Sequence, residues 1–240
     1  MSHRVRALLR VSPKTALQTD EWRVLVTAHL QLIVAPPGAS PRAVKRQGSS
    51  MALFEESFLE PTKFMREWIV APGMSARNGV LNFAPGHDLG WCAGLTRRND
   101  FRDFSLTSDV RVISRAVGLV LRAAGPDQYY MFQFDLGNDP SVVWFHTFTP
   151  KVDEGYRLDL VPSALAPRTG VWHRMSVVAR GHSFEVFLSE EDGPLQHCAS
   201  WQDPWQTYRE GAVGVWEHGG EAGEYRAFRV EELQHHQRGD

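Results

Sequence analysis

The sequence has little cysteine and no long apolar run, and these absences exclude several classes of protein. Two of the 240 residues are cysteines, Cys92 and Cys198, too few for a disulfide scaffold or a four-sulfur metal site. We expect two buried thiols rather than a bridge. No run of eighteen apolar residues occurs, so no membrane span is predicted. Phosphate-binding loops, nucleophile elbows and His-Glu-x-x-His helices are also missing from the sequence.

Neither sign of charge is in large excess over the whole chain. The chain has 26 basic and 28 acidic side chains, for a formal charge of −2. Residues 1–50 hold eight Lys or Arg against two acids, which leaves 18 basic and 26 acidic groups in the remaining 190 residues. A body with a charge of −8 argues against a nucleic acid as the partner.

The first fifth of the chain is predicted to be a separate, flexible extension. Residues 35–50 read APPGASPRAVKRQGSS, a composition typical of linkers. We therefore predict an extension over 1–50, a domain over 51–233 and a polar tail over 234–240. The alternative is that residues 22–34 form an element that docks on the domain.

The same segment bears on localisation. The apolar stretch 24–35 is interrupted by His29 and Gln31 and begins far from the start, which makes it a poor match to a signal peptide. A cytoplasmic location is favoured on this basis.

Beyond residue 53 the pattern is that of consecutive strands. In residues 104–113, alternation places Phe104, Leu106, Ser108, Val110 and Val112 on one face. Further strands are predicted over 117–123, 129–136, 142–148, 156–161, 172–180, 183–188, 212–216 and 224–233. We expect a hairpin at Gly181-His182 and pairing of the last two strands. Short strands separated by turns indicate an all-β protein, an antiparallel β-sandwich of the jelly-roll type.

Alternation within residues 129–136 separates two faces. Tyr130, Phe132 and Phe134 are apolar and should face the core between the sheets. Tyr129, Met131, Gln133 and Asp135 then face outward, and we expect them on the concave side. The same rule puts Gly118, Val120 and Arg122 on this side, together with Trp144, His146, Trp216 and His218.

Several segments in this order resemble a known family. They are DFRDFSLTSDVRV (100–112), GLVLR (118–122), YMFQFD (130–135), VWHRMSVVARGHSFEVFL (171–188) and GAVGVWEHGGEAGEYRAFRVEEL (211–233). Over residues 53–233 the chain is similar to the 3-keto-disaccharide hydrolase family of concanavalin A-like jelly rolls. The resemblance implies elimination and hydration at a sugar that carries a ketone on carbon 3. Such a reaction needs a base, an electrophile and a proton donor.

The candidate residues divide by role. For catalysis the candidates are Arg122, His218 and His146. For substrate binding they are Gln133, Asp135, Trp144, Trp216 and Tyr129, because indoles stack on sugar rings while polar side chains bind hydroxyls. Structural roles are the alternative: the two tryptophans as packing, His146 as an ordinary strand histidine, and Arg122 as the partner of Asp135.

The sequence departs from the family at important positions. The family commonly has Glu where Met131 stands and Gln where Trp216 stands, and its Asn-Ser-Gly is here Ala116-Val117-Gly118. Loss of a carboxylate favours the alternative of a non-catalytic carbohydrate-binding module. A third alternative is a protein-interaction domain. Asp135 is the one acid predicted on the concave face, and Glu217 should point inward, which counts against a two-carboxylate glycosidase.

A divalent metal such as calcium is a further possibility that the sequence leaves open. Acidic loop residues could bind it at Asp153-Glu154 or Glu190-Glu191-Asp192, although such loops are usually just solvated. The His235-His236 pair resembles a polar tail more than a ligand pair. The oligomeric state is not predicted.

Overall fold

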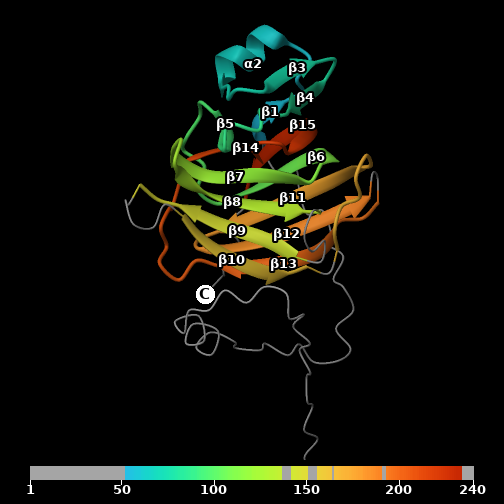
Figure 1. Cartoon of the computed structure of the whole chain (residues 1–240). Coiled ribbons are helices and arrows are strands. Elements are labelled where there is room, and N and C mark those ends of the chain that lie inside the picture. Colours follow the sequence, from blue (N-terminus) through green and yellow to red (C-terminus); the bar gives the residue numbers. More distant parts are fainter. Residues whose placement is uncertain (1–51, 137–141, 151–155, 164, 191–192, 234–240) are drawn as a thin grey trace, which may run out of the picture. The chain divides into compact units, whose positions relative to one another are not determined.

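The computed structural model of the chain (Figure 1) describes residues 52–136, 142–150, 156–163, 165–190 and 193–233. The predicted extension over 1–50 and the tail over 234–240 lie outside these residues, so the predicted domain boundaries stay predictions. The described residues form strands and one short helix. In this part of the chain no helix is long and apolar enough to cross a membrane.

The strands form two antiparallel sheets, as the alternation predicted. In spatial order, the first sheet contains β13 (Gln196–Gln202), β12 (Ser183–Glu190), β11 (Trp172–Arg180), β6 (Phe104–Ser114), β15 (Ala222–Glu232), β4 (Val80–Phe83) and β3 (Met74–Arg77), and β1 (Ala52–Glu56) also pairs with β15. The second sheet contains β10 (Tyr156–Pro162), β9 (Val142–Phe148), β8 (Gln128–Asp135), β7 (Ala116–Gly125), β14 (Ala212–His218), β5 (Trp91–Thr96) and β2 (Trp68–Ile69). In Figure 1 the strands β7–β10 lie in front of β11–β13.

The core lies between the sheets and is built from the predicted faces. Tyr130, Phe132 and Phe134 of β8 are buried in one cluster with Leu106 and Val110 of β6. Alternating strand residues point to opposite faces, so the other half of β8 is left for the outer side of its sheet. Both cysteines are free and buried, as expected.

One helix, α2 (Pro61–Glu67), lies between β1 and β2 in the described part of the chain. Pro61 occupies its first turn, where its missing N–H costs nothing. The helix buries Phe64, whose ring lies 5.9 Å from that of Phe58 and 5.7 Å from that of Trp68. These aromatic contacts attach the helix to the end of the sandwich.

The hairpin at Gly181-His182 is confirmed, because Arg180 pairs with Ser183 across it. The predicted pairing of the last two strands is wrong. β14 pairs with β5 and β7 in the second sheet, whereas β15 pairs with β1, β4 and β6 in the first. The connection over residues 219–221 therefore crosses from one sheet to the other. Consecutive strands that look like a hairpin in sequence are separated here by the core.

Candidate functional site

The outer face of the second sheet, which we call the site face, carries the predicted binding residues in register. Trp216 of β14 is opposite Gly118 of β7, Gly118 is opposite Gln133 of β8, and Gln133 is opposite Trp144 of β9. Met131 and His146 are likewise paired. Directly opposed residues on adjacent strands share a face. The sheet thus brings Trp216, Gln133 and Trp144 into one row.

Aromatic rings fill one part of the site face. Tyr129 lies 4.6 Å from Phe148, and its hydroxyl accepts a hydrogen bond of 3.2 Å from Trp216 Nε1. The His146 ring stacks near Phe148 and Trp216, at centroid distances of 5.7 and 6.1 Å. Burial lowers the pKa of His146 to about 4, so its imidazole is neutral at pH 7.

Trp91 is an aromatic residue of the site face that the sequence analysis missed. It begins β5, lies 5.2 Å from Phe148 and is 50% exposed. Trp216 beside it is buried. A half-exposed indole can pack against a flat apolar ligand surface. The alternation of Trp91, Ala93 and Leu95 indicates a strand, but this pattern is too short to distinguish from chance.

Polar groups gather around Gln133, in the middle of the row. Gln133 Nε2 donates a hydrogen bond of 2.9 Å to Glu221 Oε2, and the same oxygen accepts the backbone N–H of His218 at 2.9 Å. Burial, followed by the charge of Asp135, raises the pKa of Glu221. Asp135 and Glu221 are both more than nine-tenths buried. Two carboxyl groups, an amide and a histidine thus meet here.

Glu221 was also missed, because the loop that carries it was predicted as a hairpin turn. Gly219 N–H donates to Gly90 O at 2.7 Å, and Gly220 N–H donates to Pro85 O at 3.3 Å. Gly220 has φ +90°, and a Cβ there would lie 2.5 Å from His87 Nδ1. Glycine adopts this backbone angle without strain, whereas a side chain here would be strained and would also displace the exposed His87 ring. The two backbone hydrogen bonds to Gly90 and Pro85 hold the loop that carries Glu221.

Arg122 does not join the site face, and the expectation that it does is wrong. The pairing of β7 with β8 shifts register between Leu121 and Gly125, and Arg122 has φ +50°. A β-bulge breaks the alternation from which its face was predicted. The Arg122 guanidinium is 1% exposed and donates to the backbone oxygens of Arg102 (2.6 and 2.9 Å), Tyr208 (3.3 Å) and Gly181.

The acidic partner of Arg122 is Asp103, at 3.4 Å. The alternative pairing with Asp135 is therefore wrong too. The Arg122 side chain thus connects the segments that carry Arg102, Gly181 and Tyr208.

Glu217 points inward, as alternation predicted. Its side chain is fully buried, and its Oε1 accepts a hydrogen bond of 2.7 Å from the Tyr225 hydroxyl. Burial raises the pKa of Glu217 well above its usual value. A Cβ on Gly223 would lie 2.3 Å from Glu217 Oε1, so this glycine makes room for the carboxyl group. Glu217 therefore lies behind the site face, on the strand that carries Trp216 and His218.

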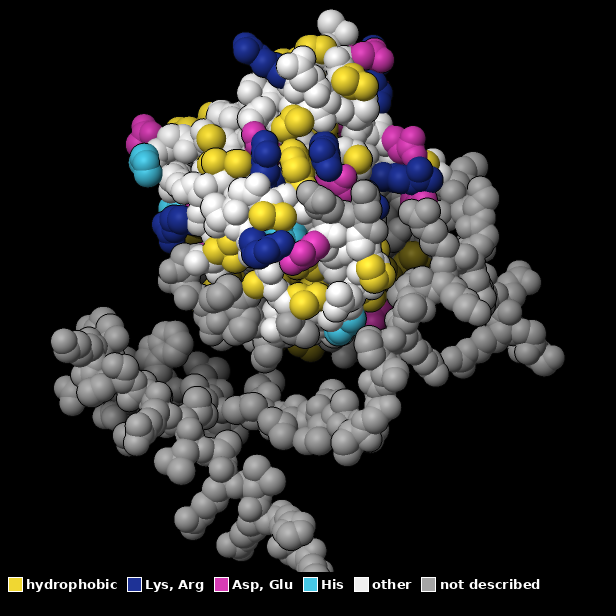
Figure 2. Space-filling model, turned by 90° about the vertical axis from the view of Figure 1, so that its right-hand side faces the viewer, with side chains coloured by type: hydrophobic (Ala, Val, Ile, Leu, Met, Phe, Trp, Pro, Cys, Tyr) yellow, Lys and Arg dark blue, Asp and Glu magenta, His cyan; other side chains and the backbone are white. Residues whose placement is uncertain are grey.

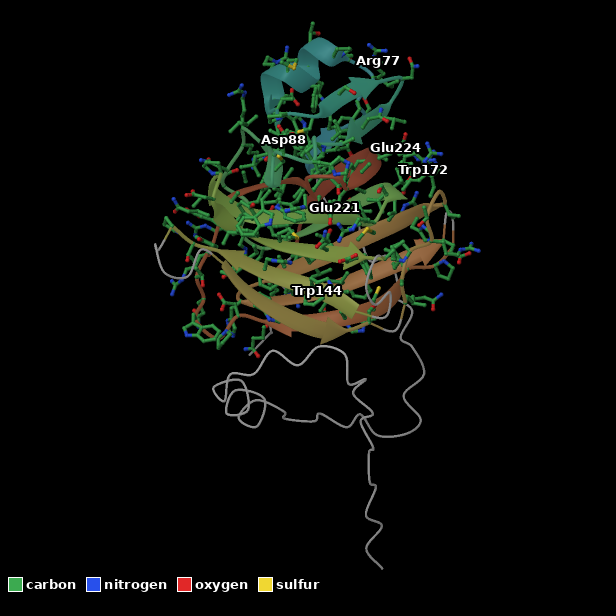
Figure 3. All side chains as sticks on the ribbon, in the orientation of Figure 1. Arg77, Asp88, Trp144, Trp172, Glu221 and Glu224 are labelled. Carbon is green, nitrogen blue, oxygen red and sulfur yellow. The ribbon has the colours of Figure 1, made fainter. Side chains whose placement is uncertain are left out.

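The outer face of the first sheet is a different surface. Two guanidinium groups lie over the Trp172 ring. The Cζ atoms of Arg111 and Arg226 are 4.7 and 4.2 Å from the ring centroid. Arg111 pairs with Glu224, and Asp109 bridges Arg226 and Arg174. Trp172 and Glu224 are labelled together in Figure 3, and basic, acidic and hydrophobic side chains intermingle on this side of the molecule in Figure 2. The two guanidinium groups cover the Trp172 indole.

Metal ligands do not cluster in the part of the chain that the structure describes. No group of three or more His, Cys, Asp or Glu side chains there could hold an ion. Asp153-Glu154, Glu191-Asp192 and His235-His236 lie outside the described residues. Glu190 forms an exposed ion pair of 3.0 Å with Arg168.

Comparisons with known proteins support the fold and no finer identity. No family model and no curated protein matches the chain. The structure is similar to the carbohydrate binding module CBM66 from Bacillus subtilis, with a TM-score of 0.54 and 15% identity over 69% of this chain and 96% of that one. It is also similar to a legume lectin-like domain from Entamoeba histolytica (TM-score 0.56, 8% identity, 78% and 100% covered). A third similar structure is the GH43 protein BlXynB from Bacillus licheniformis, with a TM-score of 0.54 and 13% identity over 75% of this chain and 39% of that one.

These similarities identify the architecture. The chain is an all-β jelly-roll sandwich, as predicted. At such low identities a likeness in structure carries no function, since one fold hosts many. Membership of the 3-keto-disaccharide hydrolase family stays a prediction.

Proposed function

We propose that the protein is a carbohydrate-binding jelly roll whose ligand lies on the site face. The observation that carries this proposal is the neighbourhood of aromatic rings and hydrogen-bonding groups on one sheet face. Trp91, Trp144 and Trp216 lie on the same face as the hydrogen-bonded pair of Gln133 and Glu221. The named carbohydrate-binding module and the lectin-like domain among the structural neighbours agree with it.

The chemistry of a sugar matches both parts of this face. A pyranose has an apolar C–H surface that packs on an indole, and hydroxyls that bond to amides and carboxylates. Half-exposed Trp91 is the stacking residue, and Gln133, Asp135 and Glu221 bind hydroxyls. His218 contributes its ring at the edge of this polar group.

Binding is tested with glycan-array screening followed by calorimetry on the full chain. Trp91→Ala should weaken binding of the selected glycan by about tenfold, because loss of one stacking contact costs about 1 kcal/mol or more. Trp205→Ala is the matched control, since Trp205 is also exposed but lies in the loop before β14. No glycan bound by the wild type, or equal losses in both variants, would contradict the proposal.

A second candidate is turnover of 3-keto-glycosides at the same face. The raised pKa of Glu221 beside Asp135 favours it, because a carboxyl with a pKa nearer neutrality can take or give a proton. In this scheme Glu221 or His218 removes the proton on carbon 2, the anomeric substituent leaves, and water adds. Arg122 has no part in it, and Met131 supplies no carboxylate.

Turnover is tested by incubating the protein with 3-keto-trehalose and 3-keto-glucosides and following sugar release. The enzyme hypothesis expects release that falls at least about a hundredfold in Glu221→Gln, the lower range for loss of a general acid or base. Release that is undiminished in Glu221→Gln and His218→Ala would exclude this site. Binding without release would leave the carbohydrate-binding module.

A further inference from the structure

The imidazole of His218 is oriented by a carbonyl group of the loop that follows it. Its Nδ1 lies 3.1 Å from the backbone oxygen of Gly219. A carbonyl oxygen can only accept a hydrogen bond, so Nδ1 carries the proton that is donated. A neutral imidazole has one N–H, and its second nitrogen carries a lone pair. In neutral His218 that second nitrogen is Nε2, which is therefore a hydrogen-bond acceptor.

The Nε2 atom of His218 has no partner in the described part of the chain. The hydrogen bonds of His218 there are the one from Nδ1 to Gly219 and the one from its backbone N–H to Glu221 Oε2. The side chain is partly exposed, and Nε2 is not one of the buried polar atoms that lack a partner. An acceptor that reaches the surface without an internal donor can bind a donor from a ligand.

Trp91 is the neighbour of His218 on the adjacent strand. The two residues are directly opposite each other in the pairing of β5 with β14. Residues in this relation share a face, with Cβ atoms about 5 Å apart. Trp91 is 50% exposed and is the stacking residue of the proposed function. The edge of a sugar that packs on this indole is thus within reach of the His218 ring.

The backbone connects these two side chains through Gly219. Its N–H donates a hydrogen bond of 2.7 Å to the oxygen of Gly90, the residue before Trp91, and its carbonyl orients the His218 ring. Gly219 is buried, and a Cβ there would lie 2.8 Å from the backbone oxygen of Gly86. The loop therefore packs closely on the segment that leads to Trp91, and one residue relates the acceptor to the stacking indole.

We propose that Trp91 and His218 form one subsite, in which a sugar ring packs on the indole and one of its hydroxyls donates a hydrogen bond to His218 Nε2. A sugar that lacks this hydroxyl would leave Nε2 covered and without a donor, which is unfavourable. The subsite thus selects sugars whose apolar C–H surface is bordered by an unsubstituted hydroxyl. This inference rests on the proposed carbohydrate binding and names the group that the site recognises.

Deoxy sugars test the role of Nε2. Methyl glucoside, methyl galactoside and methyl mannoside are compared with their monodeoxy analogues by NMR titration of the full chain at about pH 8.5, where neutral imidazole predominates. For at least one parent sugar, removal of one particular hydroxyl should weaken binding about fivefold. In His218→Asn the same removal should cost less than about twofold, because Asn can still donate to the Gly219 oxygen but has no atom at the position of Nε2.

His182→Asn is the matched control for this comparison. His182 is also partly exposed, but it lies in the turn between β11 and β12 of the first sheet, where its Nε2 is 2.6 Å from Gln202 Nε2. This variant should keep the wild-type cost of removing each hydroxyl. Melting curves check that both variants are folded.

Nitrogen NMR tests the tautomer on the wild-type chain alone. In assigned long-range proton–nitrogen correlation spectra at about pH 8.5, His218 should carry its proton on Nδ1 and none on Nε2. Saturation with a methyl glycoside should then shift the Nε2 resonance more than that of Nδ1, because Nε2 gains the new hydrogen bond. A proton on Nε2 would overturn the proposal, since this nitrogen would then be a donor.

The two proposals fail in different ways. If neither a glycan of the array nor a methyl glycoside binds, carbohydrate binding itself is contradicted and the inference fails with it. If array glycans bind but no methyl glycoside does, carbohydrate binding stands and the subsite is overturned. The subsite is also overturned if every hydroxyl costs the same in the wild type and in His218→Asn.

Discussion

Glu217 carries a carboxyl group into the interior between the two sheets, where water cannot solvate a charge. Its raised pKa means that the folded protein keeps this proton to a higher pH than the unfolded chain does. Between the two pKa values folding takes up a proton, so stability falls as the pH rises. Below the unfolded pKa, near 4.5, the group is protonated in both states and this contribution is fully present.

Glu217→Gln should therefore be more stable than the wild type at high pH only. The difference in free energy of unfolding should be small near pH 4 and grow with pH by up to about 1.4 kcal/mol per unit. Urea unfolding at several pH values measures it. Glu185→Gln, an exposed acid, is the control. Parallel pH curves for wild type and Glu217→Gln would show that the carboxyl is ionised in the folded state.

Arg122 is predicted to matter for stability and not for sugar chemistry. Arg122→Met removes the hydrogen bonds to the backbone oxygens of Arg102, Gly181 and Tyr208, which should cost about 3 kcal/mol. Arg122→Lys should lose most of the same energy, because one ammonium cannot serve all three oxygens. The exposed Arg168 is the control, and its change to Met should cost less than about 0.5 kcal/mol.

At the scale of elements, the loop between β14 and β15 fixes the position of Glu221. Gly220→Ala strains the backbone at φ +90° and places a Cβ 2.5 Å from Nδ1 of the exposed His87, whose side chain must move. We expect a loss of about 2 kcal/mol in stability together with weaker sugar binding. In Gly170→Ala, with φ +76° and open space around the Cβ, only the strain remains. Equal effects on sugar binding would contradict the role of the loop.

Alternation predicted the strands from β6 onward except β13, which was missed, and it made errors where the chain leaves regular geometry. Tyr130 and Gln133 point to the faces predicted for them, because β8 pairs without a bulge from Tyr129 to Phe134. Arg122 does not, because a bulge follows Leu121. Short strands such as β3 and β4 have four residues each, too few for a period to be evident. Glu221 depends on a contact with residues 85–90, which no local pattern encodes.

At the scale of the whole molecule, the sequence predicts that residues 1–50 are an extension separate from the sandwich. The charge of +6 and the linker composition predict that removal of residues 1–50 leaves the melting temperature within about 2 °C, below the shift of a 1 kcal/mol loss. Differential scanning calorimetry of the full and shortened chains measures this. A drop of many degrees would favour an element over 22–34 that docks on the domain.

Because the chain crosses from one sheet to the other between β14 and β15, a ligand bound to one sheet should also change the dynamics of the other. Glu221 belongs to neither sheet, yet it lies between a strand of the second sheet and the strand that pairs with β1, β4 and β6 in the first. A ligand that restrains Glu221 also restrains the start of β15. Amide hydrogen exchange should then slow in β15 and β4, which lie in the sheet that the ligand does not touch.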